Sequence, residues 1–442
     1  MPPRIDFWNM SPRLLFILRS LPAFAACALL PAAAPAQIAQ PSSTRVSILD
    51  SGAVGDGATL NTGHIQAAID QLAAKGGGTL VVPKGVFVSG ALFLKPGVNL
   101  QLEKDAVLKC STDLKNFPVQ RTRIEGHFED HFNPALINAT GCDGLHITGE
   151  GMLDGDGKPV WDQFWKMRKA NKGFKNLDLP RARLALIENS KNVVIDGITF
   201  KDSQYWNLHL YKDQDTLVQN ARFEVPDDYK QAPSTDGIDV DSCQRVTIQK
   251  CYFSTTDDCI CMKGSKGPDA LQDKDSPPVE HVRISDCTFK RGNGVLTLGS
   301  EATTVRDVVI ENCRVFGSIH VACLKLRGDT PQDYEDIHFH NLTLDGTGPI
   351  IDIQPWRQYY DLKGQPPPKS TVRNITISGV KGRYGSFGVI RPNPGQTTIG
   401  DIILEDFDVQ LKKPNLEAKG ITALKFTNIM VNGAPVYSSP AP

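Results

Sequence analysis

VTIQKCYF at residues 246–253 is followed by VRISDCTF at 282–289, and each apolar residue returns at the same place in the octet. Each octet holds two short runs of alternating apolar and polar residues around a break, which is typical of two β-strands joined by a bend. Four further octets share this pattern, namely VVIDGITF (193–200), VVIENCRV (308–315), IHFHNLTL (337–344) and IILEDFDV (402–409). Because so short a unit cannot bury its apolar face alone, the repeat predicts stacked coils of a β-solenoid.

The solenoid is expected to form one all-β domain over residues 46–435. Upstream of the octets, residues 61–74 carry Ile65, Ala68, Ile69 and Leu72 at helical spacing and are followed by three glycines at 76–78. Apolar residues at this spacing, ended by glycine, predict an amphipathic helix. We therefore expect an N-terminal helix that caps the first coil of the solenoid.

Composition narrows the class of protein. The 442 residues include 48 Lys and Arg against 49 Asp and Glu, a formal net charge of −1, and 40% of the residues are apolar. This is a globular composition without the basic surplus that nucleic-acid binding needs. After residue 40 no uncharged apolar run reaches the roughly 18 residues of a membrane span, so none is expected.

The N-terminal segment predicts export. Arg4, Arg13 and Arg19 precede a short apolar stretch at residues 21–30, and Ala34-Pro35-Ala36 fits a small-x-small cleavage site. These are the three parts of a secretory signal peptide, and the apolar stretch is too short for a membrane anchor. We expect residues 1–36 to be a signal peptide and residues 37–45 a linker, which places the protein outside the cell or in the periplasm.

The cysteines favour packing over bridging. Nine of the ten lie beyond residue 36, so internal pairing would leave at least one thiol free. Cys251, Cys287 and Cys313 take the place in the octet that Ile198 and Leu342 hold elsewhere, and they are expected to fill one interior column. Cys259 and Cys261 form a CxC pair rather than CxxC, and no metal site is expected there.

A strand beside each octet brings acidic residues together. Aligning these strands by their apolar phase places Ile238, Ile260, Val295 and Leu324 in one buried column and puts Trp206, Asp236, Asp258, Asn293 and Ala322 in another at the strand start. Asp257 lies beside them if a local bend turns it outward. The pKa values of clustered carboxyls are pushed apart, so that one carboxyl can act as an acid and another as a base. Glycoside hydrolysis requires such a pair. A Ca²⁺ site and solvated turns are the alternatives.

At these residues the chain resembles glycoside hydrolase family 28, the polygalacturonases and rhamnogalacturonan hydrolases. The family motifs Asn-Thr-Asp, Asp-Asp, Gly-His-Gly and Arg-Ile-Lys have counterparts in the same order at Ser234-Thr235-Asp236-Gly237, Thr256-Asp257-Asp258-Cys259, Gly292-Asn293-Gly294 and Lys325-Leu326-Arg327. The resemblance implies a single-stranded right-handed parallel β-helix. It also implies an inverting hydrolase in which Asp257 is the general acid and Asp236 and Asp258 activate water, with no metal or other cofactor.

Two departures from the family pattern bear on substrate binding. Asn293 replaces the family histidine and cannot take up a proton, while Lys325 and Arg327 exchange the family's arginine and lysine. The basic pair is expected to hold a uronate carboxylate through charge-assisted hydrogen bonds. The loss of histidine favours an exo-acting or branched-pectin enzyme over an ordinary endo-polygalacturonase.

Three further residues are candidates for substrate binding. Lys263 and His209 are expected to face outward on nearby strands, and Trp206 to stack on a sugar ring; residues 355–360 combine aromatic and cationic groups and are expected to close one end of a cleft. The expected partner is a pectic polysaccharide or oligosaccharide, bound by a monomer. A Ca²⁺-dependent pectate lyase and an inactive carbohydrate-binding β-helix are the competing interpretations.

Overall fold

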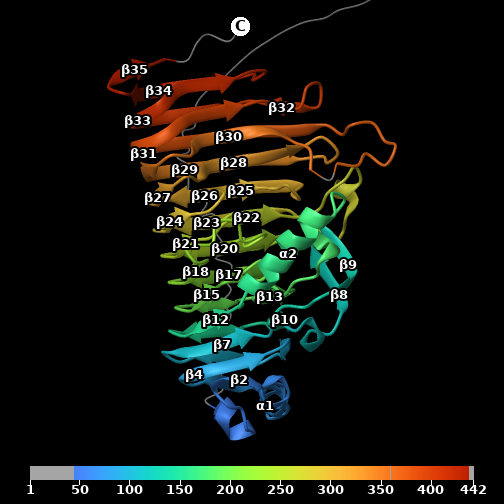
Figure 1. Ribbon diagram of the computed structural model, residues 1–442. Helices are drawn as coiled ribbons and strands as arrows, with labels where there is room; N and C mark the ends of the chain where they lie inside the picture. Colours follow the sequence, from blue (N-terminus) through green and yellow to red (C-terminus); the bar gives the residue numbers. More distant parts are fainter. Residues whose placement is uncertain (1–43, 359, 438–442) are drawn as a thin grey trace, which may run out of the picture. The chain divides into compact units, whose positions relative to one another are not determined.

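The computed structural model describes residues 44–358 and 360–437. The predicted signal peptide and residues 37–43 of the predicted linker lie outside the described residues. Within them, short strands stack in parallel from residue 45 to residue 431, and each coil contributes up to three strands (Figure 1). The architecture is a parallel β-helix, as the octets predict.

The strands form three parallel strips, one along each side of the coil. The first strip consists of β5 (Leu92–Leu94), β10 (Ile137–Thr140), β13 (Ala185–Glu188), β16 (Leu208–Tyr211), β19 (Ile238–Asp241), β22 (Ile260–Lys263), β25 (Gly294–Leu298), β28 (His320–Arg327) and β30 (Pro349–Trp356). Alternate side chains point into the coil, so that Leu208, Ile238 and Ile260 join the core and their neighbours point outward. This strip is the one that carries the acidic residues.

The octets supply the second and third strips. The second consists of β1 (Arg45–Ser47), β3 (Gly78–Val82), β6 (Val98–Leu102), β11 (His146–Gly149), β14 (Val194–Asp196), β17 (Gln214–Gln219), β20 (Gln244–Gln249), β23 (Val279–Ser285) and β26 (Thr304–Glu311). The third consists of β2 (Asp56–Leu60), β4 (Gly85–Ser89), β7 (Ala106–Cys110), β12 (Met152–Asp154), β15 (Thr199–Lys201), β18 (Arg222–Glu224), β21 (Tyr252–Ser254), β24 (Thr288–Arg291) and β27 (Arg314–Gly317). Near the C-terminal end some strands run through a corner of the coil and so belong to more than one strip. These long strands are β29 (Asp333–Gly346), β31 (Ser370–Ile390), β33 (Ile402–Ala418) and β34 (Leu424–Val431).

Few elements depart from the coil. They are the helices α1 (Thr62–Ala74) and α2 (Lys158–Ala170), the 3₁₀ turns η1 (Ile48–Ser51), η2 (Leu114–Asn116), η3 (Asn176–Asp178) and η4 (Ala270–Gln272), the antiparallel hairpin of β8 (Gln120–Ile124) and β9 (His127–Phe132), and the short strands β32 (Thr397–Ile399) and β35 (Ala434–Val436). No helix within residues 44–358 and 360–437 has the length and apolarity that crossing a membrane requires.

Helix α1 closes the N-terminal end of the solenoid. Its apolar face, Ile65, Ala68, Ile69 and Leu72, is buried in the same core cluster as the first strands. Asn61 Oδ1 accepts a hydrogen bond from the Val54 amide at 2.7 Å, and this contact fixes the segment in front of the helix. The predicted capping helix is confirmed, and in Figure 1 it lies below β2 and β4.

The core consists of columns of like side chains, as stacking requires. Phe200, Phe223, Phe253 and Phe289 lie one above another with ring centroids 4.8–5.0 Å apart and planes within 11° of parallel. Cys251, Cys287 and Cys313 occupy the expected interior column, and all nine cysteines of the described residues are buried and free. The structure therefore supports the interpretation that these cysteines pack as small apolar groups.

The phenylalanine column allows a test of the stacking. Replacing Phe253 by Leu removes two ring contacts, and we expect the free energy of unfolding to fall by about 2 kcal/mol. Phe316, which is 36% exposed on β27, is the control, and its change to Leu should cost less than about 0.5 kcal/mol. Urea denaturation of the two variants measures the difference, and equal shifts of the midpoint would contradict the packing argument.

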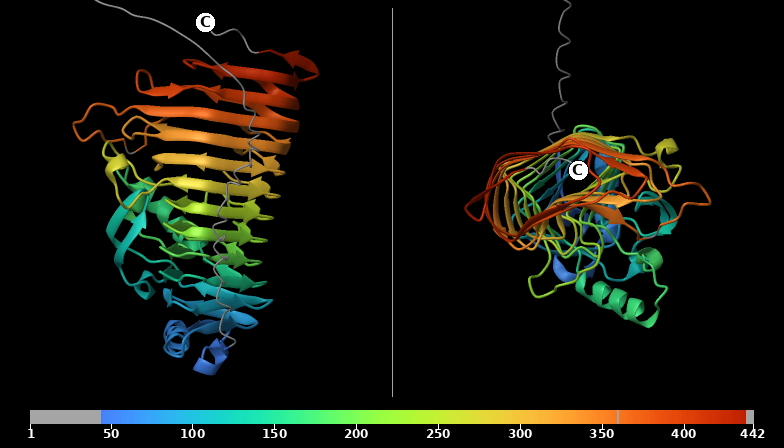
Figure 2. Two further views of the ribbon diagram at one scale, coloured as in Figure 1. Left: turned by 180° about the vertical axis from the view of Figure 1, so that it is seen from behind. Right: turned by 90° about the horizontal axis from the view of Figure 1, so that it is seen from above.

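Several connecting segments project from the same side of the solenoid. The β8–β9 hairpin, the η4 loop and the loop after β30 leave the stack on one side in both the frontal view and the view from above (Figures 1 and 2). Helix α2 lies against the outside of the stack near the first of these segments. The hairpin, α2 and the segment after β30 each contribute side chains to a cavity over the first strip.

Candidate active site

A cavity of about 430 Å³ lies over the beginning of the strands of the first strip. Seven of the nine site residues predicted from sequence line it, namely Trp206, Asp236, Asp257, Asp258, Lys263, Asn293 and Lys325. They come from coils separated by up to 119 positions in the chain, and the stacking of the strands brings them together.

Asp236 and Asp258 start neighbouring strands. Ile238 pairs with Ile260, and the Gly237 amide donates to the Asp258 carbonyl at 2.9 Å, so that the two carboxyls occupy the same level of adjacent coils. A Cβ at position 237 would overlap the Cys259 carbonyl oxygen, and for this reason only glycine allows the coils to approach this closely behind Asp236.

Asp257 lies in the turn between β21 and β22. The Asp258 amide donates to Asp257 Oδ1 at 3.0 Å, and this contact closes the turn. Because the residues of a turn need not alternate between faces, both carboxyls line the cavity, as the expected bend requires. Asp257 remains partly exposed toward the cavity, whereas Asp258 is 1% exposed.

The register above Asp258 corrects the sequence alignment. Ile260 pairs with Leu296 rather than with Val295, and the level of Asp258 is therefore that of Gly294. This offset of 36 residues is the one between the octets, in which Phe253 pairs with Phe289; a β-bulge, where Ser254 pairs with Arg291, raises the offset to 37 only locally. Ala322 was aligned with Asp258, but it pairs with Leu296 and therefore lies level with Ile260, further along the strand.

Asn293 reaches Asp258 in spite of this shift. Its Nδ2 donates to Asp258 Oδ1 at 2.8 Å, and Lys325 Nζ lies 2.8 Å from Asp258 Oδ2. Burial opposes ionisation of this carboxyl, but the lysine ammonium and the amide outweigh it and lower the pKa of Asp258. Asp258 is therefore the carboxylate of the cluster that is held ionised.

The neighbouring Asp257 has the opposite tendency. Its burial and the negative charge of Asp258 beside it raise the pKa of Asp257 above the ordinary 3.8, although Lys325 and Lys263 partly oppose the shift. Adjacent carboxyls with diverging pKa values supply one proton donor and one proton acceptor in the same cavity.

A second lysine lies within a ring of carboxyls. Lys263 Nζ lies 3.3 Å from Glu301 Oε2 and 3.8 Å from both Asp236 Oδ2 and Asp239 Oδ1. This position lowers the pKa of Glu301, while burial and the charge of Asp257 raise the pKa of Asp236. Glu301 follows β25 in the segment Gly294–Glu301 and was not singled out from sequence. Its place at a strand end near the acidic column is the signal that could have identified it.

Two of the predicted residues lie elsewhere. His209 has no exposed surface and sits behind Trp206, with the ring centroids 5.0 Å apart, while its Nδ1 lies 2.8 Å from Arg183 Nη1. Its burial lowers its pKa to about 4. We expected the His209 imidazole to be exposed on the outer face of the strand. Trp206 covers it instead, so the ring lies behind the cavity wall.

Arg327 faces a different cavity. Its guanidinium forms two hydrogen bonds with the Asp329 carboxylate, at 2.8 and 2.7 Å, and it is 1% exposed in the lining of a second cavity of about 590 Å³. Because Asp329 already satisfies this cation, the expected Lys325–Arg327 pair does not form in the first cavity. The two cavities share Glu125 and Asn176 in their linings.

Several residues of the wall were not predicted from sequence. They come from the β8–β9 hairpin, from α2, from the segment between β15 and β16 and from the loop before β19, and include Glu125, Phe164, Trp165, Arg168, Tyr205 and Lys230. Trp356 and Gln358 of the stretch expected to close the cleft also line the cavity. The hairpin and α2 lie in long connections between coils, where no repeat indicates their position.

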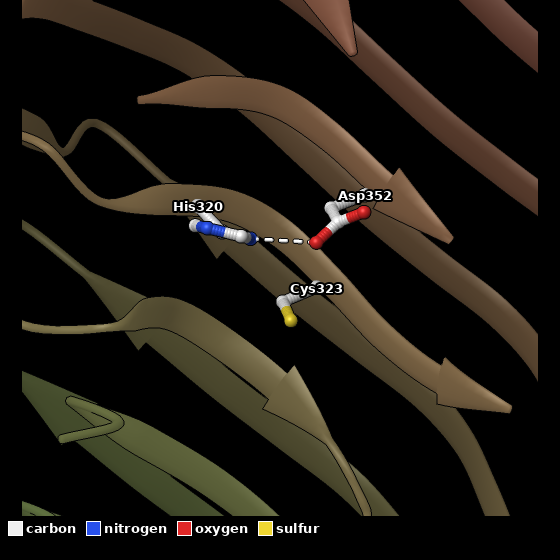
Figure 3. A group of neighbouring side chains, drawn as sticks. All are labelled: His320, Cys323 and Asp352. Atoms are coloured by element: carbon white, nitrogen blue, oxygen red, sulfur yellow. Dashed lines mark hydrogen bonds and ion pairs between the residues drawn. The ribbon is translucent and has the colours of Figure 1, made fainter. Parts of the chain in front are cut away.

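In the part of the chain that the structure describes, two groups of side chains have the spacing of metal ligands. In the first, Asp236, Asp258 and Cys261, the ammonium groups of Lys263 and Lys325 already neutralise the carboxylates. In the second, His320 Nδ1 lies 2.7 Å from Asp352 Oδ2 and Cys323 lies beside them (Figure 3). Burial raises the pKa of Cys323 to about 12, which keeps it a thiol and a poor ligand.

Fold and site together define a parallel β-helix protein with a cleft of carboxyls and lysines. The family model described as glycosyl hydrolases family 28 matches residues 75–429, and the chain belongs to this family. It is 32% identical to a probable polygalacturonase of Vitis vinifera over 67% of this chain and 60% of that protein. It is 27% identical to an exopolygalacturonase of Zea mays over 75% of each chain.

Solved structures support the same architecture. A hyperthermoactive exopolygalacturonase from Thermotoga maritima aligns with a TM-score of 0.74 at 24% identity, over 89% of this chain and 93% of that one. A polygalacturonase from Erwinia carotovora aligns with a TM-score of 0.63 at 19% identity, over 89% and 97%. At these identities the likeness establishes the fold.

Proposed function

We propose that the protein is an exported glycosidase that hydrolyses pectic polysaccharide by inversion, as a polygalacturonase does. The observation that carries the proposal is the divergence in pKa of Asp257 and Asp258 within one cavity, in a chain that belongs to family 28. The names of the relatives support galacturonan as the substrate class.

Each carboxyl of the cluster has a role in this reaction. Asp257, whose pKa is raised, donates its proton to the glycosidic oxygen. Asp258, held ionised by Lys325, accepts a proton from the attacking water, and Asp236 on the adjacent coil helps to orient that water. An inverting pair needs roughly 6.5–9.5 Å between acid and base so that the water fits between them.

Exo action is favoured over endo action. The β8–β9 hairpin and α2 contribute Glu125, Trp165 and Arg168 to the cavity wall, and a walled cavity suits the end of a chain better than its middle. Relatives from Zea mays and Dickeya chrysanthemi are named for exo activity. A rhamnogalacturonan or a side-chain galacturonide or rhamnoside is the alternative substrate.

The activity can be tested directly. In EDTA, the protein should release new reducing ends from polygalacturonate without an increase in ultraviolet absorbance, because hydrolysis creates no double bond. Proton NMR of the first product should show the anomer opposite to that of the bond cleaved. Absorbance that requires added Ca²⁺ would indicate a lyase, and cleavage of rhamnogalacturonan alone would change the substrate class.

Export has its own test. The chain expressed with its N-terminus in a bacterial host should reach the periplasm or the medium and begin at Gln37, after cleavage behind Ala36. N-terminal sequencing of the recovered protein checks this, and full-length protein retained in the cytoplasm would contradict it.

A further inference from the structure

Two cations of the cavity wall have no carboxylate partner. Lys263 and Lys325, the lysines on the first strip, are already engaged with Asp236, Asp239 and Glu301 or with Asp258. Arg168 and Lys230 also line the cavity and are exposed, and neither makes an ion pair within residues 44–358 and 360–437. Their positive charge is therefore available to a ligand.

Helix α2 and the loop before β19 bring these cations to one wall. Trp165 Nε1 donates to the Gln231 carbonyl at 2.7 Å, and this bond joins the helix to the residue next to Lys230. Arg168 lies one turn further along the helix, with its guanidinium carbon 5.8 Å from the centroid of the Trp165 ring. The half-buried indole thus lies beside one cation and is bonded to the neighbour of the other.

The wall is itself firmly attached to the solenoid. Trp161 Nε1 donates to the Ser203 carbonyl at 3.0 Å, and Tyr229 packs on the Trp161 ring at 4.8 Å between centroids. Tyr229 also donates to Asp162 Oδ1 at 2.8 Å, which makes a second link between loop and helix. Arg168 and Lys230 are therefore presented from a supported surface.

We propose that Trp165, Arg168 and Lys230 form a subsite that binds an acidic sugar unit of the substrate beside the carboxyl cluster. The indole provides a face for the sugar ring, and the two cations take its carboxylate. The inference rests on the proposed function and deepens it: it assigns a uronate, rather than a neutral sugar such as rhamnose, to this part of the cavity. A neutral unit would leave both cations without a partner.

Binding measurements separate this subsite from the chemistry. We would titrate a galacturonate oligosaccharide and its methyl ester into the Asp257→Asn protein, and into the same protein carrying Arg168→Gln, Lys230→Gln or both. Each single change should raise the Kd for the free acid about fivefold and the double change about twentyfold. This loss of affinity should be smaller in high salt, since salt screens the exposed charges of Arg168 and Lys230. The Kd for the ester should not change.

Lys169→Gln is the matched control. Lys169 is exposed on the same helix and does not line the cavity, so its loss changes the net charge equally without removing a contact. An equal loss of affinity in this control would mean that overall charge, not a subsite, attracts the substrate. An unchanged Kd in the double variant, or an equal loss for acid and ester, would also overturn the proposal.

The kinetics distinguish failure of the subsite from failure of the proposed function. In the otherwise native protein, the double change should raise KM for polygalacturonate and leave kcat within about twofold, because the wall touches no reacting bond. If the native protein cleaves no pectic polymer, the proposed function fails, while the binding comparison still decides whether the subsite exists. Activity with unchanged KM in the double variant would reject the subsite alone.

Discussion

Replacing Asp257 by Asn should lower kcat on polygalacturonate by about 10³-fold, the usual contribution of a general acid. Asn keeps the size of the side chain and can still accept from the Asp258 amide, whose nitrogen lies 3.0 Å from Asp257 Oδ1. What it loses is the proton that the raised pKa of Asp257 retains for the leaving oxygen. Initial rates at saturating substrate measure the effect, and KM should change little.

How the loss of activity depends on the leaving group and on pH tests whether Asp257 is the general acid. From a nitrophenyl galacturonide the nitrophenolate anion departs without protonation, so the Asp257→Asn protein should hydrolyse this substrate with only a small loss of rate. The alkaline limb of the pH profile reports deprotonation of the acid and should vanish in the variant. A circular dichroism melt should match that of the native protein. If the variant kept more than a tenth of kcat on the polymer, Asp257 would not be the acid.

The coil and its cap follow from sequence because stacking repeats the same side chain at the same place. Six octets were visible because each has apolar residues at four equivalent positions. A further coil lies at residues 216–223, where Val218 pairs with Ile248 and Phe223 stacks between Phe200 and Phe253. Thr216 and Ala221 weaken the apolar pattern there, which hid a coil that the phenylalanine column makes plain.

The acidic cluster could be predicted in composition but not in register. Asp236, Asp257 and Asp258 gather as expected because strands of the first strip begin at one level. The position of Asn293 was misaligned by one residue, because Val295 was taken as the partner of Ile260, whereas the neighbouring Leu296 is equally apolar and buried and is the true partner. Its amide still reaches Asp258, because a side chain can span a shift of one residue.

The outward-facing residues were harder to place than the inward ones. An apolar period indicates which side chains enter the core, but not what covers those that leave it. Trp206 covers His209, and Asp329 engages Arg327. The wall that carries Arg168 arises from α2, an insertion between coils whose docking depends on the tertiary contacts of Trp161 with residues distant in sequence.

Replacing Lys325 by Met should lower the free energy of unfolding by about 3–5 kcal/mol at neutral pH, because it leaves the buried carboxylate of Asp258 without its cation. The Lys325 side chain is 12% exposed and that of Asp258 is 2% exposed, so that solvent screens the pair little. Lys325→Arg is the matched control: it keeps the charge and should recover most of the loss, although its planar group fits the site differently.

The effect depends on pH with a definite sign. In the native protein the pKa of Asp258 is depressed, so its contribution to stability is present above the unfolded value near 3.8 and is lost as the pH falls toward the folded value. Without Lys325, the burial of Asp258 raises this pKa, and the variant loses stability as the pH rises. The gap in stability between the two proteins should therefore widen between about pH 3 and pH 7. Denaturation at several pH values measures it.

The same substitution should move the acid limb of kcat/KM. The base must be ionised to accept a proton from water, and Asp258 in the Lys325→Met protein should become protonated at a higher pH than in the native protein. The rise in the pKa of Asp258 should reduce kcat/KM strongly on the acid side and much less near neutrality. Because loss of fold would lower activity at every pH, a displaced limb is the signature of Lys325 acting through Asp258. An acid limb that stays in place would assign the base to Asp236 instead.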